Sequence, residues 1–377
     1  MPADTDRQIG ATITRLTRRQ NLSRDEAVRA FTTILNNDTT AMQQGAFLAA
    51  LAAKGETAAE IAGAWDAIYR LDTVRIDLDV GRPLVENSGT GMDAVKTFNI
   101  STAAAVVAAA GGISVARHGA RSITSACGTV DMAEALGVDV ECPVATVAGS
   151  IRTAGIGLFN GMSPAVHPRA LGRLLSQIHF GSILNTAASL ANPARPTVGL
   201  RGVYDSRMIE PVIRVMRAIG YRQAIVLYGR VDGIRDGGMD EASVCGPTDC
   251  ARLGADGGIQ RFVIQPEEYG LEGHDPAELA PAGDLAAEAR RFTAILDNRE
   301  RGAARAAVLL NAALIFYVAE TVPTIAAGLA KADTLLVSGR AGQTLTAWVG
   351  AQNRDPRAGL RRLQKLRAEA PFTRRAS

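Results

Sequence analysis

The stretch that decides the fold spans residues 83–125 and reads PLVENSGTGMDAVKTFNISTAAAVVAAAGGISVARHGARSITS. It begins with a short apolar run and a glycine-rich turn, continues through the apolar helical run Ala103–Ala110, and reaches the β-branched run Ile113–Val115. Similar β-branched runs recur later, between longer helical segments, at Ile225–Leu227 and Phe262–Ile264. This alternation predicts an α/β fold with a central sheet flanked by helices.

The chain before this stretch reads as helix after helix. Ser23 and Glu26 have the spacing of a capping box, in which each side chain satisfies a free amide at the start of a helix. Apolar residues follow at helical intervals. We therefore predict a small all-helical domain over residues 1–75, joined by a segment near 165–190, and hinged to a large α/β domain over residues 80–370.

Composition excludes several classes of protein. The 377 residues are 47% hydrophobic and 21% charged, which is typical of a globular enzyme. The net charge of +3 gives no reason to expect nucleic acid or a membrane as a partner. The start of the sequence has no signal-peptide pattern, and the four cysteines lack the spacing of a zinc site. We expect a cytoplasmic protein.

Three polar stretches could bind phosphate. Asn87–Asp93 is a glycine-rich turn whose backbone amides could form an anion nest, although it could also be an ordinary turn. Lys96–Thr102 precedes an apolar helix whose N-terminus would favour an anion, although one of its side chains could simply cap the helix. Arg117–Ser125 combines two arginines, a histidine and several hydroxyls, which suits either a multiply charged phosphate or a solvated loop.

A fourth stretch contains the adjacent carboxylates of Asp240 and Glu241. Neighbouring carboxylates repel each other and usually lie on the surface. They become useful where a hard cation such as Mg²⁺ lies between them and a diphosphate. The pair therefore predicts either an exposed loop or a magnesium site.

Taken together, these four stretches resemble the anthranilate phosphoribosyltransferases. That family carries a Gly-Thr-Gly-Gly-Asp loop, an Asn-Ile-Ser-Thr segment, a Lys-His-Gly-Asn-Arg loop and a late Asp-Glu pair, in the order found here. The resemblance implies the fold shared with pyrimidine nucleoside phosphorylases and a homodimer formed through the helical domain. It also implies phosphoribosyl diphosphate as the donor substrate and Mg²⁺ as the cofactor.

The resemblance further implies roles for individual residues. The donor-binding positions are Gly89, Met92, Asp93, Thr97, Asn99, Ser101, Thr102, Arg117, Ser125 and Thr129. The magnesium positions are Ser101, Asp240 and Glu241. The acceptor positions are His118, Ala120, Arg173 and Leu175. No general base is implied, because an aromatic amine is already a nucleophile.

The sequence departs from the family pattern at five places. Met92 breaks the second glycine pair of the first loop, and Arg117 replaces a lysine. Ala120 replaces an asparagine, and Leu175 stands where the family has an arginine that meets the acceptor carboxylate. The segment before the Asp-Glu pair is longer than usual. We expect an acceptor other than anthranilate, unless the nearby Arg173 takes over the lost contact.

Two other functions remain as alternatives. A nucleoside phosphorylase-like enzyme would have no diphosphate for a metal to bridge, so the Asp240–Glu241 pair argues against it. A non-catalytic relative that binds nucleic acid is disfavoured by the near-neutral charge. The preferred prediction is a magnesium-dependent phosphoribosyltransferase that moves ribose 5-phosphate onto a nitrogen of a small aromatic acceptor, anthranilate or an analogue.

Overall fold

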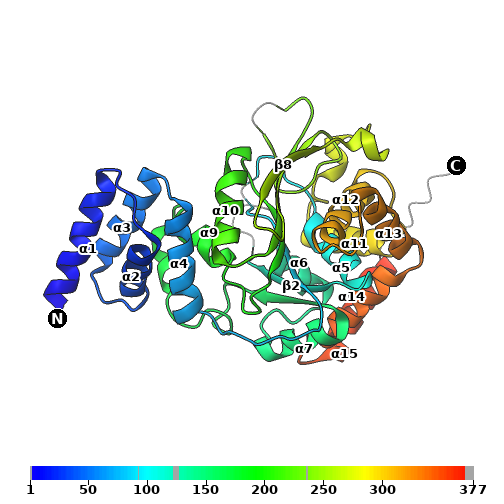
Figure 1. The fold of residues 1–377 in the computed structure, drawn as a ribbon. Helices are drawn as coiled ribbons and strands as arrows, with labels where there is room; N and C mark the ends of the chain where they lie inside the picture. Colours follow the sequence, from blue (N-terminus) through cyan, green and yellow to red (C-terminus); the bar gives the residue numbers. More distant parts are fainter. Residues whose placement is uncertain (1, 92, 122–126, 235–236, 370–377) are drawn as a thin grey trace.

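The computed structural model describes residues 2–91, 93–121, 127–234 and 237–369. Met92 and Ser125, two of the expected donor-binding residues, lie outside this part of the chain. Figure 1 shows a small helical bundle beside a larger body that contains the sheet. This confirms the predicted α/β fold with a small N-terminal helical domain. No helix among the described residues is long and apolar enough to cross a membrane.

Four N-terminal helices form the small bundle: α1 Pro2–Thr17, α2 Arg24–Leu35, α3 Ala41–Lys54 and α4 Ala58–Leu71. The predicted capping box is confirmed, because Ser23 and Glu26 each hydrogen-bond the other's backbone at the start of α2. Phe31 and Ile34 on the inner face of α2 are fully buried. The bundle therefore begins and packs as its local sequence dictates.

A later segment completes this bundle. Helices α8 Leu171–Ile178 and α9 Ile183–Ser189 pack into the same hydrophobic cluster as α1–α4. The carboxylate of Asp72, at the end of α4, accepts hydrogen bonds from the amides of residues 169, 170 and 171 at 2.6–2.9 Å. The Trp65 indole donates to the Leu190 carbonyl at 2.8 Å. These bonds fix residues 169–190 against the bundle.

The sheet of the larger body is mixed. Five parallel strands have the order β3-β2-β1-β4-β5, with bounds β1 Leu84–Ser88, β2 Ser114–Gly119, β3 Ile156–Asn160, β4 Val198–Gly202 and β5 Gln223–Arg230. The antiparallel strands β7 Thr248–Leu253 and β8 Ile259–Ile264 extend the sheet beyond β5, and the short β6 Gly238–Met239 also pairs with β5.

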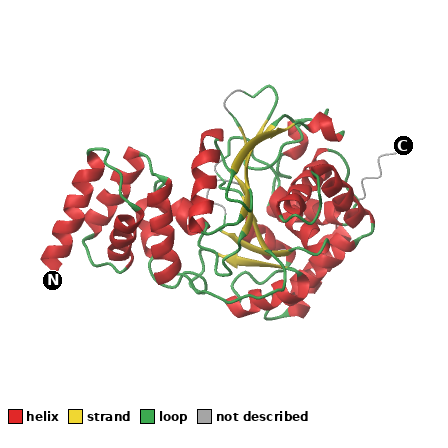
Figure 2. Ribbon diagram, viewed as in Figure 1, coloured by secondary structure: helices red, strands yellow, loops and turns green. Residues whose placement is uncertain are grey.

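Helices cover both faces of the sheet (Figure 2). On one face, α10 Ile209–Ile219 lies between the sheet and the helical bundle. On the other face, α5 Ile100–Ala110 and α12 Ala303–Val318 are buried almost all round, as their nearly unbroken apolar composition requires. The remaining helices are α6 Thr129–Leu136, α7 Val144–Ala154, α11 Leu285–Leu296, α13 Ile325–Val337, α14 Arg340–Ala351 and α15 Pro356–Glu369, with 3₁₀ turns at Ser206–Met208, Pro266–Tyr269 and Pro276–Leu279.

The strand order reverses between β1 and β4, the point at which open α/β sheets typically bind their ligands. From β1 the chain builds outward through β2 and β3, and then returns to the other side of β1 to form β4 and β5. At such a point of reversal the loops after the two strands diverge, which leaves a crevice at the carboxyl ends of the strands. The glycine-rich loop follows β1, so the topology puts it at this crevice.

Candidate active site

The glycine-rich loop after β1 packs directly against Asp240. The Gly91 amide donates a hydrogen bond to Asp240 Oδ2 at 2.7 Å. A Cβ atom added at Gly89 would collide with the Asp240 carboxylate, and one added at Gly202, at the end of β4, would collide with the Asp240 backbone. Glycine at these two positions therefore allows the carboxylate to reach the crevice between β1 and β4.

Glu241 occupies a second anion-binding position, at the N-terminus of α5. Its Oε1 accepts a hydrogen bond from the Ser101 amide at 3.0 Å. Asn99 is the N-cap residue but makes no side-chain capping bond, and its amide nitrogen instead donates to the Cys127 carbonyl at 3.2 Å. The simple capping role considered from the sequence is thus not what satisfies the start of α5. A carboxylate from a distant loop does so.

Burial and mutual repulsion act on both carboxylates. The pKa of Asp240 is raised by burial and then by the nearby charge of Asp93, and the pKa of Glu241 is raised by burial and then by the charge of Asp240. A divalent cation would relieve this repulsion, and carboxylate and hydroxyl oxygens are the ligands that Mg²⁺ prefers. In the described ranges no cluster of three or more histidine, cysteine, aspartate or glutamate side chains could hold a metal. The donor set therefore fits Mg²⁺ shared with a phosphate ligand rather than a closed protein cage.

Arg117 joins the two anion-binding positions. It projects from β2, is 2% exposed, and donates to the Asn87 carbonyl at 3.3 Å and to Ser101 Oγ at 3.2 Å. It also hydrogen-bonds the Thr102 hydroxyl. Burial lowers the pKa of Arg117 to about 10, so its guanidinium remains charged at neutral pH. Its charge lies beside the N-terminus of α5, where a phosphate would bind.

The other expected donor-binding residues surround this group less closely. Asp93 is buried and forms an ion pair with Lys96 at 3.1 Å. Thr97 is half-buried in the loop that precedes α5. Thr129 begins α6, and its Cγ2 lies 3.1 Å from the position that a Cβ on Gly119 would take. The Asn99–Cys127 hydrogen bond joins the segment after β1 to the segment after β2.

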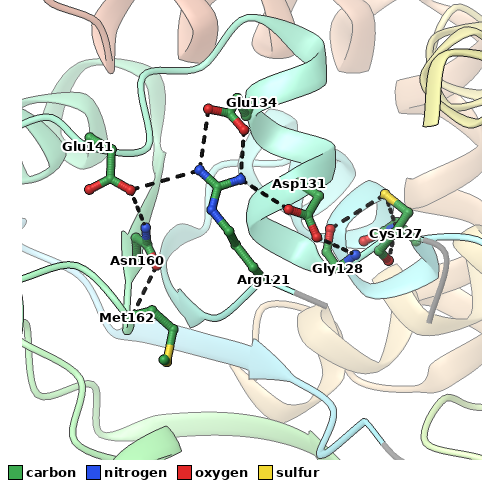
Figure 3. Close-up of polar contacts among 9 residues, drawn as sticks. Arg121, Cys127, Gly128, Asp131, Glu134, Glu141, Asn160 and Met162 are labelled. Atoms are coloured by element: carbon green, nitrogen blue, oxygen red, sulfur yellow. Dashed lines mark hydrogen bonds and ion pairs between the residues drawn. The ribbon is translucent and has the colours of Figure 1, made fainter. Parts of the chain in front are cut away.

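Arg121 is engaged by protein carboxylates. Its guanidinium contacts Glu134 at 2.7 Å and Asp131 at 3.1 Å, and Glu141 lies 3.9 Å away (Figure 3). Three carboxylates thus offset its charge. The sequence pattern grouped Arg117 and Arg121 together as candidate phosphate ligands. In the structure, of these two arginines only Arg117 lies beside the anion-binding amides.

The expected acceptor residues are not brought together. His118 is buried at the end of β2, and the nearby Ala120 is exposed. Arg173, on α8, donates to Gln44 Oε1 at 2.8 Å and to the Ile34 carbonyl at 2.9 Å, so the helical bundle engages its guanidinium. Leu175 packs against the hydrophobic cluster of that bundle. In the described part of the chain no hydrogen bond or ion pair links Arg173 to His118.

Two residues that the sequence motifs did not single out lie beside His118. Nε2 of His167 is 3.3 Å from Nε2 of His118. Arg201, on β4, is 2% exposed and donates to Ser88 Oγ at 2.8 Å and to Ser189 Oγ at 2.6 Å. The signal that could have indicated Arg201 is a single charge inside the otherwise apolar run TVGLRGV at 197–203.

Comparisons with known proteins agree with this arrangement. The glycosyl transferase family, a/b domain, matches residues 81–342, and the helical bundle domain of the same family matches residues 11–71. Anthranilate phosphoribosyltransferase of Anaeromyxobacter dehalogenans strain 2CP-C is 39% identical over 342 residues, which cover 90% of this chain and 97% of that protein.

Solved structures give the same result. Anthranilate phosphoribosyltransferase from Thermus thermophilus matches with a TM-score of 0.81 at 28% identity, covering 90% of this chain and 98% of that one. The Saccharomyces cerevisiae enzyme in complex with PRPP and Mg shares the fold, with a TM-score of 0.76 at 22% identity over 90% of this chain and 98% of that one. The chain therefore belongs to the anthranilate phosphoribosyltransferase family and is a pentosyltransferase.

Proposed function

We propose that the protein is a magnesium-dependent phosphoribosyltransferase that moves ribose 5-phosphate from phosphoribosyl diphosphate to a nitrogen of a small aromatic acceptor, anthranilate or an analogue. One observation carries the proposal. The carboxylates of Asp240 and Glu241 each accept a hydrogen bond from a backbone amide that a phosphate could use, Gly91 on the glycine-rich loop and Ser101 at the start of α5. A diphosphate has the charge and the oxygen atoms to take those places.

The chain's own groups account for donor binding. The amides of Gly91 and Ser101 would donate to phosphate oxygens, and the Arg117 guanidinium would offset part of their charge. Phosphate binding would displace Asp240 and Glu241 from these amides, so that they and the Ser101 hydroxyl become available to hold Mg²⁺. We therefore expect donor and metal to bind with positive coupling.

The reaction breaks the bond between the ribose carbon and the diphosphate oxygen as the acceptor nitrogen attacks from the opposite side. Bound Mg²⁺ supplies Lewis-acid stabilisation of the departing diphosphate. The protein's contribution is to hold the two reactants in line, which is worth up to about 7–11 kcal/mol in well-oriented intramolecular reactions. The position of His118 in the crevice supports binding of the acceptor next to the donor.

The alternatives fit less well. Inorganic phosphate in a nucleoside phosphorylase reaction would leave the Asp240–Glu241 carboxylate pair without a role. A homodimer formed through the helical domain remains a prediction from the resemblance, and a cytoplasmic location remains a prediction from the sequence. The loss of contacts at Ala120 and Leu175 supports an acceptor-binding mode different from that of the family.

The test is a titration of phosphoribosyl diphosphate with and without Mg²⁺, followed by turnover with anthranilate and related amines. The double variant Asp240→Asn, Glu241→Gln should lose metal-dependent donor binding and at least about 100-fold in turnover, because charge stabilisation at the leaving group is removed. Its circular dichroism should match the wild type, since two repelling buried charges are removed.

The control is the variant Glu267→Gln, Glu268→Gln, because this pair of adjacent carboxylates is exposed. It should bind donor and turn over as the wild type does. Magnesium-dependent turnover that persists in the Asp240, Glu241 variant would contradict the proposal.

A further inference from the structure

Strand register aligns three polar residues across the crevice. Ser88 on β1 pairs with Arg201 on β4. On the other side of β1, Val85 pairs with Val115 of β2, and the same register three residues further places His118 next to Ser88. Side chains in one row across parallel strands point to the same face of the sheet. Ser88, His118 and Arg201 therefore form a row, which we call the acceptor row.

The acceptor row lies on the opposite face of the sheet from Asn87 and Arg117, but at the same carboxyl ends of the strands, where Gly89 of the glycine-rich loop directly follows Ser88. Asn87 and Arg117, one position earlier on β1 and β2, hydrogen-bond Ser101 at the start of α5. Successive side chains alternate between the two faces of a strand, so the acceptor row faces the opposite side, toward α9. Contacts with Ser189 at the end of α9 agree, since it accepts from both His118 and Arg201.

Arg201 is a buried cation without a direct anionic partner. Its terminal nitrogens bond only the hydroxyls of Ser88 and Ser189, and its Nε has no hydrogen-bond partner. Within the described residues no carboxylate lies within ion-pair distance of it. The carboxylates of Glu86 and Asp240 lie near enough to be influenced by its charge, but neither forms an ion pair with it. Glu86 Oε2 accepts from Tyr221, and Glu86 Oε1 has no partner. A buried charge in this state is costly unless an anion binds to it.

The histidines beside Arg201 lack a hydrogen-bond donor. Nδ1 of His118 faces the Ser189 carbonyl at 3.2 Å, and Nδ1 of His167 faces the Asp72 carbonyl at 2.6 Å. A carbonyl can only accept, so both Nδ1 atoms carry the hydrogen and both Nε2 atoms carry lone pairs. These lone pairs face each other at 3.3 Å. An amine placed beside them, which has two N–H bonds, could donate one to each.

We propose that Arg201, with the hydroxyls of Ser88 and Ser189, binds an acid group of the acceptor, whose N–H faces His118 and His167. The inference deepens the proposed function and rests on it. It names the residue of this chain that binds the acid of an acceptor such as anthranilate. It also explains how a chain with Leu175 at the expected arginine position, and with Arg173 engaged by the bundle, can recognise such an acid.

The experiment compares anthranilate with 2-aminobenzamide, which keeps the amine but replaces the acid by a neutral amide. Three quantities are measured in the full-length protein: donor binding with Mg²⁺, kcat/KM at saturating donor, and equilibrium binding of each acceptor without donor. The wild type should prefer the acid by roughly tenfold to a hundredfold, as a charge-assisted hydrogen bond requires. Arg201→Gln should abolish this preference, mainly through KM and acceptor Kd, while donor binding stays unchanged.

Two further variants keep the inference falsifiable. Arg201→Lys preserves the charge but loses the planar fork, so it should retain an intermediate preference even if the glutamine variant fails to fold. Arg173→Gln should keep the wild-type preference. An unchanged preference in folded Arg201→Gln, or a collapsed preference in Arg173→Gln, would overturn the assignment.

The same measurements separate this inference from the proposed function. A wild type that binds no phosphoribosyl diphosphate would contradict the function itself. Normal donor binding and turnover with equal efficiency for the acid and the amide would contradict only the role of Arg201.

Discussion

His118 should make the stability of the protein depend on pH in a measurable way. The side chain is buried, and burial, followed by the charge of His167, lowers its pKa from 6.5 to about 3. The unfolded chain takes up a proton near the ordinary histidine pKa, whereas the folded chain does not. Replacing His118 by Gln, which can still donate to the Ser189 carbonyl, removes this difference.

The sign and size follow from linkage. Because the folded pKa is lowered, the stabilising contribution is complete above pH 6.5 and is lost as the pH falls toward the folded value of about 3. At about pH 5.5 the loss from His118 alone is about 1.4 kcal/mol of unfolding free energy. Burial lowers the pKa of His167 in the same direction. The raised pKa of buried Glu86 acts in the opposite direction, so it must be cancelled in the comparison.

The assay is urea unfolding of the wild type and His118→Gln at about pH 7.5 and about pH 5.5. Subtracting the variant from the wild type at each pH cancels the groups common to both proteins. This difference should shrink by about 1.4 kcal/mol at the lower pH. A difference that is the same at both values would show that His118 titrates normally in the folded protein. The neutral lone pair required for acceptor binding would then be lost at mildly acidic pH.

Two other predictions concern a close approach and a buried charge. Gly202→Ala places a Cβ against the Asp240 backbone, so it should lower kcat roughly 100-fold by shifting the metal-binding loop. The control is Gly149→Ala, where nothing lies within 4 Å of the added Cβ, and it should leave kcat unchanged. Equal kcat in the two variants would contradict this reasoning. Glu60 is fully buried and forms an ion pair with Lys54 at 3.0 Å, so Glu60→Ala should lower the free energy of unfolding in urea by about 3–5 kcal/mol. The more exposed Glu26, which pairs with Arg15, should lose only about 1 kcal/mol when it is replaced by Ala. Similar costs would show that the Lys54 pair is solvated.

The sequence predicted local features well because their causes are local. The capping box at Ser23 and Glu26 depends on residues three apart, the β-branched run at 113–115 overlaps the start of β2, and the run at 225–227 lies within β5. The four chemical motifs were also recognisable, since each lies within a short segment. Their assembly was not, because Asp240 and Gly91 are separated by 149 positions and meet only through the strand order.

Two arginines show where reasoning from composition fails. Arg121 looked like part of a phosphate site because basic and hydroxyl residues surround it in sequence, but Glu134 and Asp131 approach it from α6. Arg201 is a single charge in an otherwise apolar run, and no polar motif next to it in the sequence adds a second sign of function. Charge in a sequence predicts a ligand only after the protein's own counter-charges are known, and those come from elements that are distant in the chain.

The position of Arg201 has a mechanical consequence for acceptor selection. An arginine on α8 would move with the helical bundle, because Asp72 ties the start of that helix to the end of α4. Arg201 instead projects from β4, and both neighbouring strands, β1 and β5, pair with β4 at Arg201 itself. The acid-binding group is thus fixed to the same sheet that carries the donor loops, so the distance between acceptor and donor is set by strand register. On this reasoning, changes in the packing of the helical bundle should alter how easily the acceptor enters the crevice. They should have less effect on the preference for an acid over an amide.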